Sequence, residues 1–228
     1  MSAGPLLLLW DIDGTLLQRA STEHARALRE AATRVHGLDG LDQVAAEYAG
    51  RTDAAILRDL LRLAGVADEA IDAQAAAVRS ASAEAFARLC PDDLSRFVAP
   101  GVPEVLAALA EREYRQALLT GNFESIGRLK IERAGLGSYF EPGQGAFGSD
   151  SASRADLPGI ARRRAGSWPR ERTVVIGDTP RDIACARADG VRVIGIATGP
   201  FPVEALADAD AVVDAASALL PVLDDWAG

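Results

Sequence analysis

Two carboxylates stand two positions apart at the end of an apolar run. Residues 6–10 read LLLLW, and Asp11 and Asp13 follow in the string DIDGT. In an extended segment these two side chains face the same side, where each charge hinders the ionisation of the other. Asp178 and Asp182 lie in a second acidic string, GDTPRD, which also follows an apolar run. Gathered in one site, these groups require a bound cation or protonation of some of them.

A third string adds groups that bind anions. TGN, formed by Thr120, Gly121 and Asn122, ends another apolar run and precedes a segment with helical spacing. A hydroxyl group beside the backbone amides of a helix N-terminus can bind a phosphate. An all-oxygen carboxylate set suits Mg²⁺, which commonly combines carboxylates with water and a substrate phosphate. Anion donors beside a metal are what phosphoryl transfer requires.

Strands of a parallel sheet must position these strings. Fully apolar runs rich in Leu and β-branched residues are typical of strands that are covered on both faces. Ligands of such sheets bind at the carboxyl ends of the strands, so the three strings should converge on one crevice. The expected strands are residues 6–10, 116–119, 173–176, 191–196 and 211–213, and the expected helices are residues 103–112, 125–134, 156–165 and 183–189.

A segment without a convincing strand interrupts this pattern. Residues 21–94 are rich in Ala, Arg, Leu and Glu, and their apolar side chains recur at helical spacing. Residues 68–89 predict one long helix with Asp68 as N-cap and Glu69 in the first turn. The predicted fold class is therefore α/β, with a Rossmann-like parallel-sheet core of residues 1–18 and 98–228 and an inserted helical cap of residues 19–97.

Composition limits the partners of the chain. A count of 33 acidic against 24 basic residues gives a net charge of −9, which disfavours nucleic acid or an anionic membrane and favours a small-molecule partner. Cys90 and Cys185 are far apart and outside any CxxC string, so we expect two buried thiols and no zinc site. The N-terminal apolar run is too short for a membrane span or a signal peptide, which predicts a cytoplasmic protein. For the oligomeric state, a monomer and a homodimer both stay open.

The strings DIDGT, TGN and GDTPRD, in this order and each after an apolar run, resemble the haloacid dehalogenase superfamily in its phosphatase branch, which includes phosphoglycolate phosphatases. A DxDGT string alone would arise by chance in roughly one of a thousand chains of this length. The resemblance covers residues 6–20 and 100–215, and the helical insert matches the position of the small helical cap of that superfamily. It implies a Mg²⁺-dependent phosphatase that hydrolyses a small phosphorylated metabolite, such as phosphoglycolate or a sugar phosphate, through an aspartyl-phosphate.

The resemblance also implies a role for each residue of the three strings. Asp11 would be the nucleophile and Asp13 the general acid and base, a role that requires a raised pKa. The carboxylates of Asp11 and Asp178 and the backbone carbonyl of Asp13 would hold Mg²⁺, and Asp182 would support them. The residues that would bind the phosphoryl group are Thr120, Gly121 and Asn122.

One departure from the family concerns the basic residue that clamps nucleophile and phosphate. Many members carry a lysine in a KP string before the last motif, whereas the corresponding region here reads GSDSASRADLPGIA. Lys130, the only lysine of the chain, lies eight residues after Asn122 on the predicted helix. Arg154 is the rival, because it stands where the usual lysine segment would begin. We place Lys130 ahead of Arg154.

Two residues of the predicted cap stay open. His24 falls where related sugar-phosphate mutases place a histidine close to the cap, but we favour a histidine on a helix surface. Arg51 would contact the leaving group of the substrate, unless its neighbour Thr52 serves only to cap the next helix. Two alternative functions also remain, a phosphomutase of the β-phosphoglucomutase type and a non-catalytic sensor of a phosphate ligand.

Overall fold

A single parallel sheet forms the centre of the protein. The structure is a computed structural model that describes residues 4–19, 22–39, 41, 44 and 47–227. Six strands lie in the order β3-β2-β1-β4-β5-β6, and every neighbouring pair is parallel, which confirms the predicted α/β class. The strands are β1 (Leu7–Trp10), β2 (Arg115–Thr120), β3 (Ala146–Phe147), β4 (Thr173–Gly177), β5 (Arg192–Ile196) and β6 (Ala211–Val213).

The central strand β1 shows why these runs are apolar throughout. Its four residues are fully buried, and they alternate between two hydrophobic clusters on opposite faces of the sheet. Leu8 and Trp10 belong to one cluster, and Leu7 and Leu9 belong to the other. A strand that is covered on both faces has no position for a polar side chain until it ends. The first polar position of this segment is accordingly Asp11.

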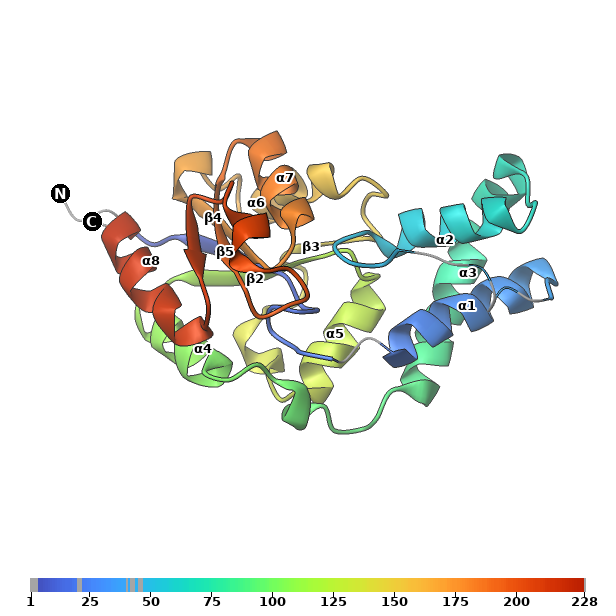
Figure 1. Cartoon of the computed structure of the whole chain (residues 1–228), viewed down its shortest axis with the longest axis horizontal. Coiled ribbons are helices and arrows are strands. Elements are labelled where there is room, and N and C mark those ends of the chain that lie inside the picture. The colour runs from blue at the N-terminus through green and yellow to red at the C-terminus, as the bar shows by residue number, and fades with distance from the viewer. Residues whose placement is uncertain (1–3, 20–21, 40, 42–43, 45–46, 228) are drawn as a thin grey trace.

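Helices cover the two faces of the sheet (Figure 1). Apolar side chains of α4 (Val102–Glu111), α5 (Glu124–Arg133) and α8 (Leu219–Ala227) join the cluster on one face. Those of α6 (Leu157–Arg164) and α7 (Pro180–Asp189) join the cluster on the other face. This arrangement leaves the carboxyl ends of the strands as the edge at which side chains from several loops can meet.

The remaining helices, α1 (Thr22–His36), α2 (Asp53–Leu63) and α3 (Asp68–Leu89), lie together beyond that edge, at the right of Figure 1. We refer to α1, α2 and α3 as the helical module. The chain leaves and re-enters the core side by side, because Leu17 and Val98 form an antiparallel bridge. Among the described helices, none combines the length and the hydropathy that a membrane span requires.

The structure differs from the sequence prediction in three local features. The short strand β3 was not predicted, because two residues carry no periodic signal. The helix α7 begins three residues earlier than expected, at Pro180, where Thr179 and Asp182 form a reciprocal capping box. The N-cap of α3 is Ala67 and not Asp68, which lies in the first turn instead. Cys90 and Cys185 are both free and buried, as expected.

Candidate active site

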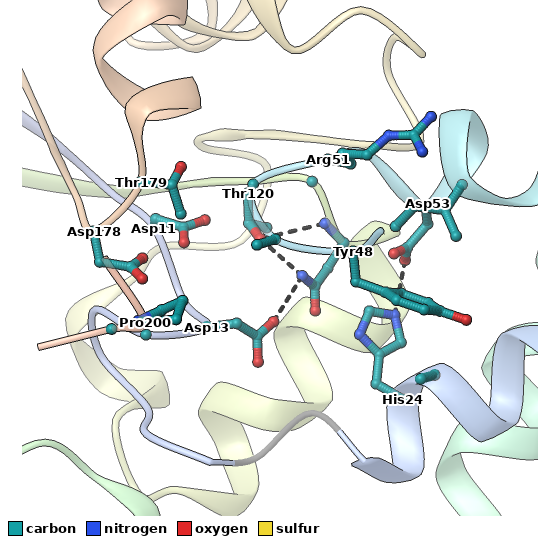
Figure 2. A pocket seen from close by; sticks show the side chains of 18 of the residues that line it. Asp11, Asp13, His24, Tyr48, Arg51, Asp53, Thr120, Asp178, Thr179 and Pro200 are labelled. Atoms are coloured by element: carbon teal, nitrogen blue, oxygen red, sulfur yellow. Dashed lines mark hydrogen bonds and ion pairs between the residues drawn. The ribbon is translucent and has the colours of Figure 1, made fainter. Parts of the chain in front are cut away.

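A pocket of about 660 Å³ opens between the carboxyl edge of the sheet and the helical module. Figure 2 shows core side chains on one side of this pocket and side chains of the module on the other. The core supplies residues that follow β1, β2 and β4, so three distant strings of the sequence meet here. The core contributes Asp11, Asp13, Thr120, Asn122, Arg154 and Asp178 to the lining. The other side contributes His24 from α1, Arg51 from the loop before α2, and Asp53 from the start of α2.

Three buried carboxylates gather at the core side of the pocket. Asp11, Asp178 and Asp182 each bring one oxygen within 4.8 Å of the others. Burial, together with repulsion from Asp182 and Asp13, raises the pKa of Asp11 to about 7, although Arg154 opposes this shift. Burial and the neighbouring charge of Asp11 raise the pKa of Asp178 to about 8. Ionisation of the cluster at neutral pH is therefore costly without further positive charge.

The Asp178 carboxylate is enclosed by backbone. Its Oδ1 accepts a hydrogen bond of 3.2 Å from the Thr15 hydroxyl, while its Oδ2 is buried and has no hydrogen-bond partner among the described residues. A Cβ atom on Gly14 would lie 2.1 Å from this Oδ2, and one on Gly199 would lie 1.7 Å from it. A buried carboxylate oxygen without a donor is what a metal ligand requires, so the cluster fits a divalent cation with oxygen ligands.

The Arg154 guanidinium contacts two members of this cluster. It lies on the short helix η4 (Arg154–Asp156), and its Nη2 donates to Asp11 Oδ1 at 2.9 Å and also to Asp182 Oδ1. Its side chain is only 9% exposed, so the ion pairs are shielded from solvent. Lys130 was preferred over Arg154 as the basic residue beside Asp11. In the structure, Arg154 forms the ion pair with Asp11, whereas Lys130 pairs with Asp13, so the geometry favours Arg154.

Lys130 contacts the second aspartate of the DIDGT string instead. This buried side chain comes from α5, and its ammonium group donates to Asp13 Oδ2 at 2.6 Å. Burial, the largest single effect, would raise the pKa of Asp13, but the charge and hydrogen bond of Lys130, with further contributions from His24 and Asn122, together hold the pKa below its usual value. A raised pKa was expected for Asp13, and the structure gives the opposite direction because the nearest charge is a cation. The carboxylate cluster described above does not include Asp13.

The TGN string lies between the end of β2 and the start of α5. Thr120 Oγ1 accepts hydrogen bonds from the backbone N–H and from the side-chain amide of Asn122, at 3.3 and 3.0 Å. The same amide donates to Asp13 Oδ2 at 3.0 Å. Thr120, Gly121 and Asn122 all line the pocket, which places them beside both aspartates of the first string.

His24 is buried, contrary to the expectation of a histidine on a helix surface. Its exposed fraction is 7%, and both ring nitrogens have partners. Nε2 lies 3.0 Å from Asp53 Oδ2, and Nδ1 lies 3.1 Å from Lys130 Nζ. The side chain belongs to the face of α1 that packs towards the core, which the helical periodicity of a single segment does not identify. Asp53, its partner, was not predicted as a site residue.

The loop before α2 settles how Arg51 and Thr52 are arranged. Thr52 Oγ1 accepts from the backbone N–H of Ala55 at 3.2 Å, so Thr52 caps the helix. The Arg51 guanidinium donates to Asp59 Oδ2 at 2.5 Å and is directed along α2, away from Asp11 and Asp13 (Figure 2). Arg51 thus lines the pocket while its charged group is engaged elsewhere.

A loop beyond the three strings also reaches the site. Thr198 Oγ1 donates to the backbone carbonyl of Gly14 at 2.6 Å, and Gly199 adjoins Asp178. These residues were not predicted as part of the site. The signal was present, since they follow the predicted strand at residues 191–196 and therefore belong to the same edge of the sheet.

Comparison with known proteins gives a match along most of the chain. The family model of haloacid dehalogenase-like hydrolases matches residues 8–187. A phosphoglycolate phosphatase of Rhodospirillum rubrum is 30% identical over 233 residues, which cover 98% of this chain and 91% of the relative.

Solved structures resemble this fold at lower sequence identity. CbbY of Rhodobacter sphaeroides, in complex with phosphate, has a TM-score of 0.69 and 20% identity, over 96% of this chain and 99% of that one. A candidate β-phosphoglucomutase from Bacteroides vulgatus has a TM-score of 0.68 and 21% identity, over 99% of this chain and 90% of that one. At such identities the similarity establishes the shared fold.

Proposed function

The chain belongs to the haloacid dehalogenase-like hydrolase family, and from this premise we propose that it is a Mg²⁺-dependent phosphatase acting on a small phosphorylated metabolite through an aspartyl-phosphate. One observation carries the proposal. Asp11 lies in a buried cluster with Asp178 and Asp182 and lines a pocket whose wall also contains Thr120. The similarity to a phosphoglycolate phosphatase makes phosphoglycolate the first substrate to test, followed by sugar phosphates.

The proposed reaction has two steps. In the first, a carboxylate oxygen of Asp11 attacks phosphorus and the bond from phosphorus to the ester oxygen breaks. Asp13, whose pKa is held low in the free protein, would take up a proton when the substrate binds and give it to the leaving oxygen. In the second, Asp13 takes a proton from water as the water oxygen attacks phosphorus. The bond from phosphorus to the Asp11 oxygen breaks, which releases inorganic phosphate and restores the Asp11 carboxylate. The hydrogen bonds that Lys130 and Asn122 donate to Asp13 Oδ2 orient its carboxyl group for both transfers.

The chain offers oxygen ligands of the kind that Mg²⁺ binds together with water molecules. Asp11, Asp178 and the backbone carbonyl of Asp13 would hold the ion, with Asp182 in support. The buried Asp178 Oδ2 without a hydrogen-bond partner and the raised pKa values of Asp11 and Asp178 support this assignment. When bound, Mg²⁺ would neutralise charge on the transferring phosphoryl group.

Positive charge and donors for the phosphoryl group come from two further places. We assign Arg154 as the clamp on Asp11, because its guanidinium already donates to that carboxylate. We assign Thr120, Gly121 and Asn122 to the phosphoryl oxygens, because all three line the pocket before the N-terminus of α5.

The helical module would serve as a cap that excludes bulk water during the reaction. The proposed division places residues 19–97 in the cap and residues 1–18 and 98–228 in the catalytic core. Its support is the contact of the module with the site, where the Asp53 backbone N–H donates to the Gly121 carbonyl at 2.8 Å. Exclusion of water strengthens every electrostatic interaction in the pocket. A pocket of about 660 Å³ suits a small metabolite.

A phosphomutase is the second candidate. The observation that favours it is the buried His24 in the same hydrogen-bonded network as Asp13, together with the likeness of fold to a candidate β-phosphoglucomutase. A mutase would return the phosphoryl group to a sugar phosphate, whereas a phosphatase releases it to water. A non-catalytic sensor is disfavoured because Asp11, Asp13 and Asp178 are all retained.

The test measures phosphate release from phosphoglycolate and a panel of sugar phosphates, with and without Mg²⁺. We expect metal-dependent release by the wild type and none by Asp11→Asn. Asp208→Asn is the matched control, since Asp208 is exposed and does not line the pocket. Transfer to a second sugar phosphate without net release would favour the mutase. No release and no transfer from any substrate would contradict both enzymatic proposals.

A further inference from the structure

Lys130 connects the core to the helical module. It comes from α5 of the core, is fully buried, and is the only lysine of the chain. Besides Asp13, its surroundings include one side chain from each helix of the module. His24 of α1 contacts its ammonium directly, Asp53 of α2 contacts His24, and the Phe86 ring of α3 lies 5.8 Å from Nζ.

The direction of the hydrogen bonds follows from the donors available. A lysine ammonium has three protons and no acceptor, so the contact with His24 Nδ1 requires that Nδ1 accept. The ring proton of the neutral histidine is then on Nε2, which donates to Asp53 Oδ2 at 3.0 Å. Lys130 thus donates in two directions, to Asp13 in the core and to His24 in the module.

Asp53 closes this chain of contacts back onto the core. The same Oδ2 accepts from the backbone N–H of Phe123 at 2.7 Å, and the exposed fraction of Asp53 is 1%. Phe123 directly follows the TGN string. His24 is therefore fixed at one nitrogen by an anchored carboxylate, and its other nitrogen is aimed at Lys130.

Phe86 excludes water from the same place. Its exposed fraction is 1%, and its ring meets the His24 ring edge-on, with centroids 5.7 Å apart. The face of an aromatic ring also attracts the ammonium group of Lys130 electrostatically. A buried ammonium needs these partners, because an unpaired charge in the interior is costly. If the module moved away, Lys130 would lose the second acceptor and the ring, which fix the position of its ammonium group on Asp13.

We propose that His24, Asp53 and Phe86 form a positioning platform through which the helical module holds Lys130 on Asp13, so that Asp13 is oriented for proton transfer only when the module is docked. The role of Asp13 rests on the proposed phosphatase function. The platform residues themselves act through Lys130 and are positioning residues. Docking of the helical module would then itself orient Asp13 for proton transfer.

The first test compares two leaving groups in His24→Ala. The specificity constant kcat/KM reports the step that forms the aspartyl-phosphate. In phosphoglycolate the leaving oxygen needs a proton, whereas p-nitrophenolate leaves as a stable anion. We expect kcat/KM for phosphoglycolate to fall about 10-fold to 100-fold and that for p-nitrophenyl phosphate to fall less than about threefold. An equal fall for both substrates would mean a merely structural role and would overturn the proposal.

Two further variants complete this comparison. His24→Gln keeps an acceptor and a donor, and we expect it to recover part of the activity on phosphoglycolate. His36→Ala is the matched control, since His36 is the last residue of the same helix and outside the pocket. Its kcat/KM should equal that of the wild type with both substrates. A loss in His36→Ala with the same preference for leaving group would also contradict the platform.

The second test asks whether His24 acts through Lys130. In a Lys130→Met background, adding His24→Ala should leave the leaving-group preference of Lys130→Met unchanged. It should lower the thermal midpoint less than His24→Ala does in the wild type, because only the contacts with Asp53 and Phe86 remain to be lost. Additive effects would overturn the proposal. The thermal cycle does not depend on activity, so it decides the coupling even if the wild type releases no phosphate, a result that would contradict the proposed function instead. If Lys130→Met does not fold, the leaving-group comparison in His24→Ala decides.

Discussion

Arg154 is the basic side chain placed to neutralise the carboxylate cluster. Its guanidinium donates to Asp11 and Asp182. Burial would lower the pKa of Arg154, but the charges of Asp182 and Asp11 hold it well above its usual value. Both hydrogen bonds come from one nitrogen, Nη2, which carries two N–H donors. The side chain therefore both orients the proposed nucleophile and limits the repulsion inside the cluster.

Removing this charge should damage both catalysis and stability. In Arg154→Met we expect kcat/KM to fall at least 100-fold. We also expect the metal-free protein to lose about 3 kcal/mol in urea unfolding, because removal of one partner leaves buried carboxylates unpaired. Arg154→Lys should be intermediate in both measurements. Arg163→Met, at an exposed position of α6, is the control and should match the wild type. Full activity in Arg154→Met would return the clamp to Lys130.

At this scale, sequence reasoning succeeds where strand position decides. Asp11, Thr120 and Asp178 could be expected to meet because each stands at the carboxyl end of a parallel strand. The contacts of His24 with Asp53 and Lys130 could not be expected, because α1 and α2 are not part of the sheet and their packing against the core has no comparable rule. The lowered pKa of Asp13 was not expected for the same reason, since the direction of the shift depends on Lys130, which comes from another element.

Between elements, the backbone of the loop before α2 lies directly against the backbone of the TGN string. A Cβ atom on Gly121 would lie 2.0 Å from the Arg51 carbonyl oxygen and 3.0 Å from the Thr52 Cα. The contact is between two backbones, so no side chain can rotate to relieve it. The absence of a side chain at Gly121 thus allows α2 to begin directly against the end of β2.

A methyl group at this point should separate the module from the core. We expect Gly121→Ala to lower kcat/KM for phosphoglycolate about 100-fold, because a displacement of about 1 Å in a reacting geometry has that effect. The loss of stability should be about 1 to 3 kcal/mol in urea unfolding. Gly137→Ala is the matched control, since its Cβ would meet nothing closer than 3.7 Å. Unchanged activity in Gly121→Ala would show that this contact does not set the site.

Helices and strands differ in how far the sequence predicts them. The strands β1, β2, β4, β5 and β6 were expected because burial on both faces leaves continuous apolar runs. The start of α7 was missed because it depends on a capping box, in which Thr179 and Asp182 bond each other's backbone. Such a cap lies outside the apolar periodicity that identifies the helix.

For the whole molecule, polar contacts join the module to the core around the pocket. Thr52 Oγ1 donates to the Ala152 carbonyl at 2.7 Å. Arg181, next to Asp182 in the sequence, donates to the Ala49 carbonyl at 2.9 Å. The composition of residues 21–94 indicates a separate helical unit, but these contacts come from loops and carry no signal in the sequence. The sequence therefore indicates a helical segment but not the contacts by which it meets the core.

Stability of the whole molecule should depend on pH through the carboxylate cluster. The folded protein holds protons on Asp11 and Asp178, with pKa values of about 7 and about 8, whereas the unfolded chain releases them near pH 4. Because the folded state binds more protons in this window, the free energy of unfolding falls as pH rises from about 5 to about 8. Carboxylates with lowered pKa values act in the opposite sense but only at acid pH, below about pH 4.5. They are Asp13, Glu47, Asp68, Asp93, Asp150 and Asp210.

Magnesium should reverse this dependence, because a cation offsets the repulsion that the lost protons leave behind. We expect the rise in thermal midpoint on adding Mg²⁺ to be small at about pH 5.5 and several degrees at about pH 8, where the metal-free protein has lost a few kcal/mol. Asp178→Asn removes one of the two titrating groups, so its metal-free stability should vary less with pH and respond less to Mg²⁺. A rise that is equal at both pH values, or larger at the lower one, would contradict the assignment of the cluster as the metal site.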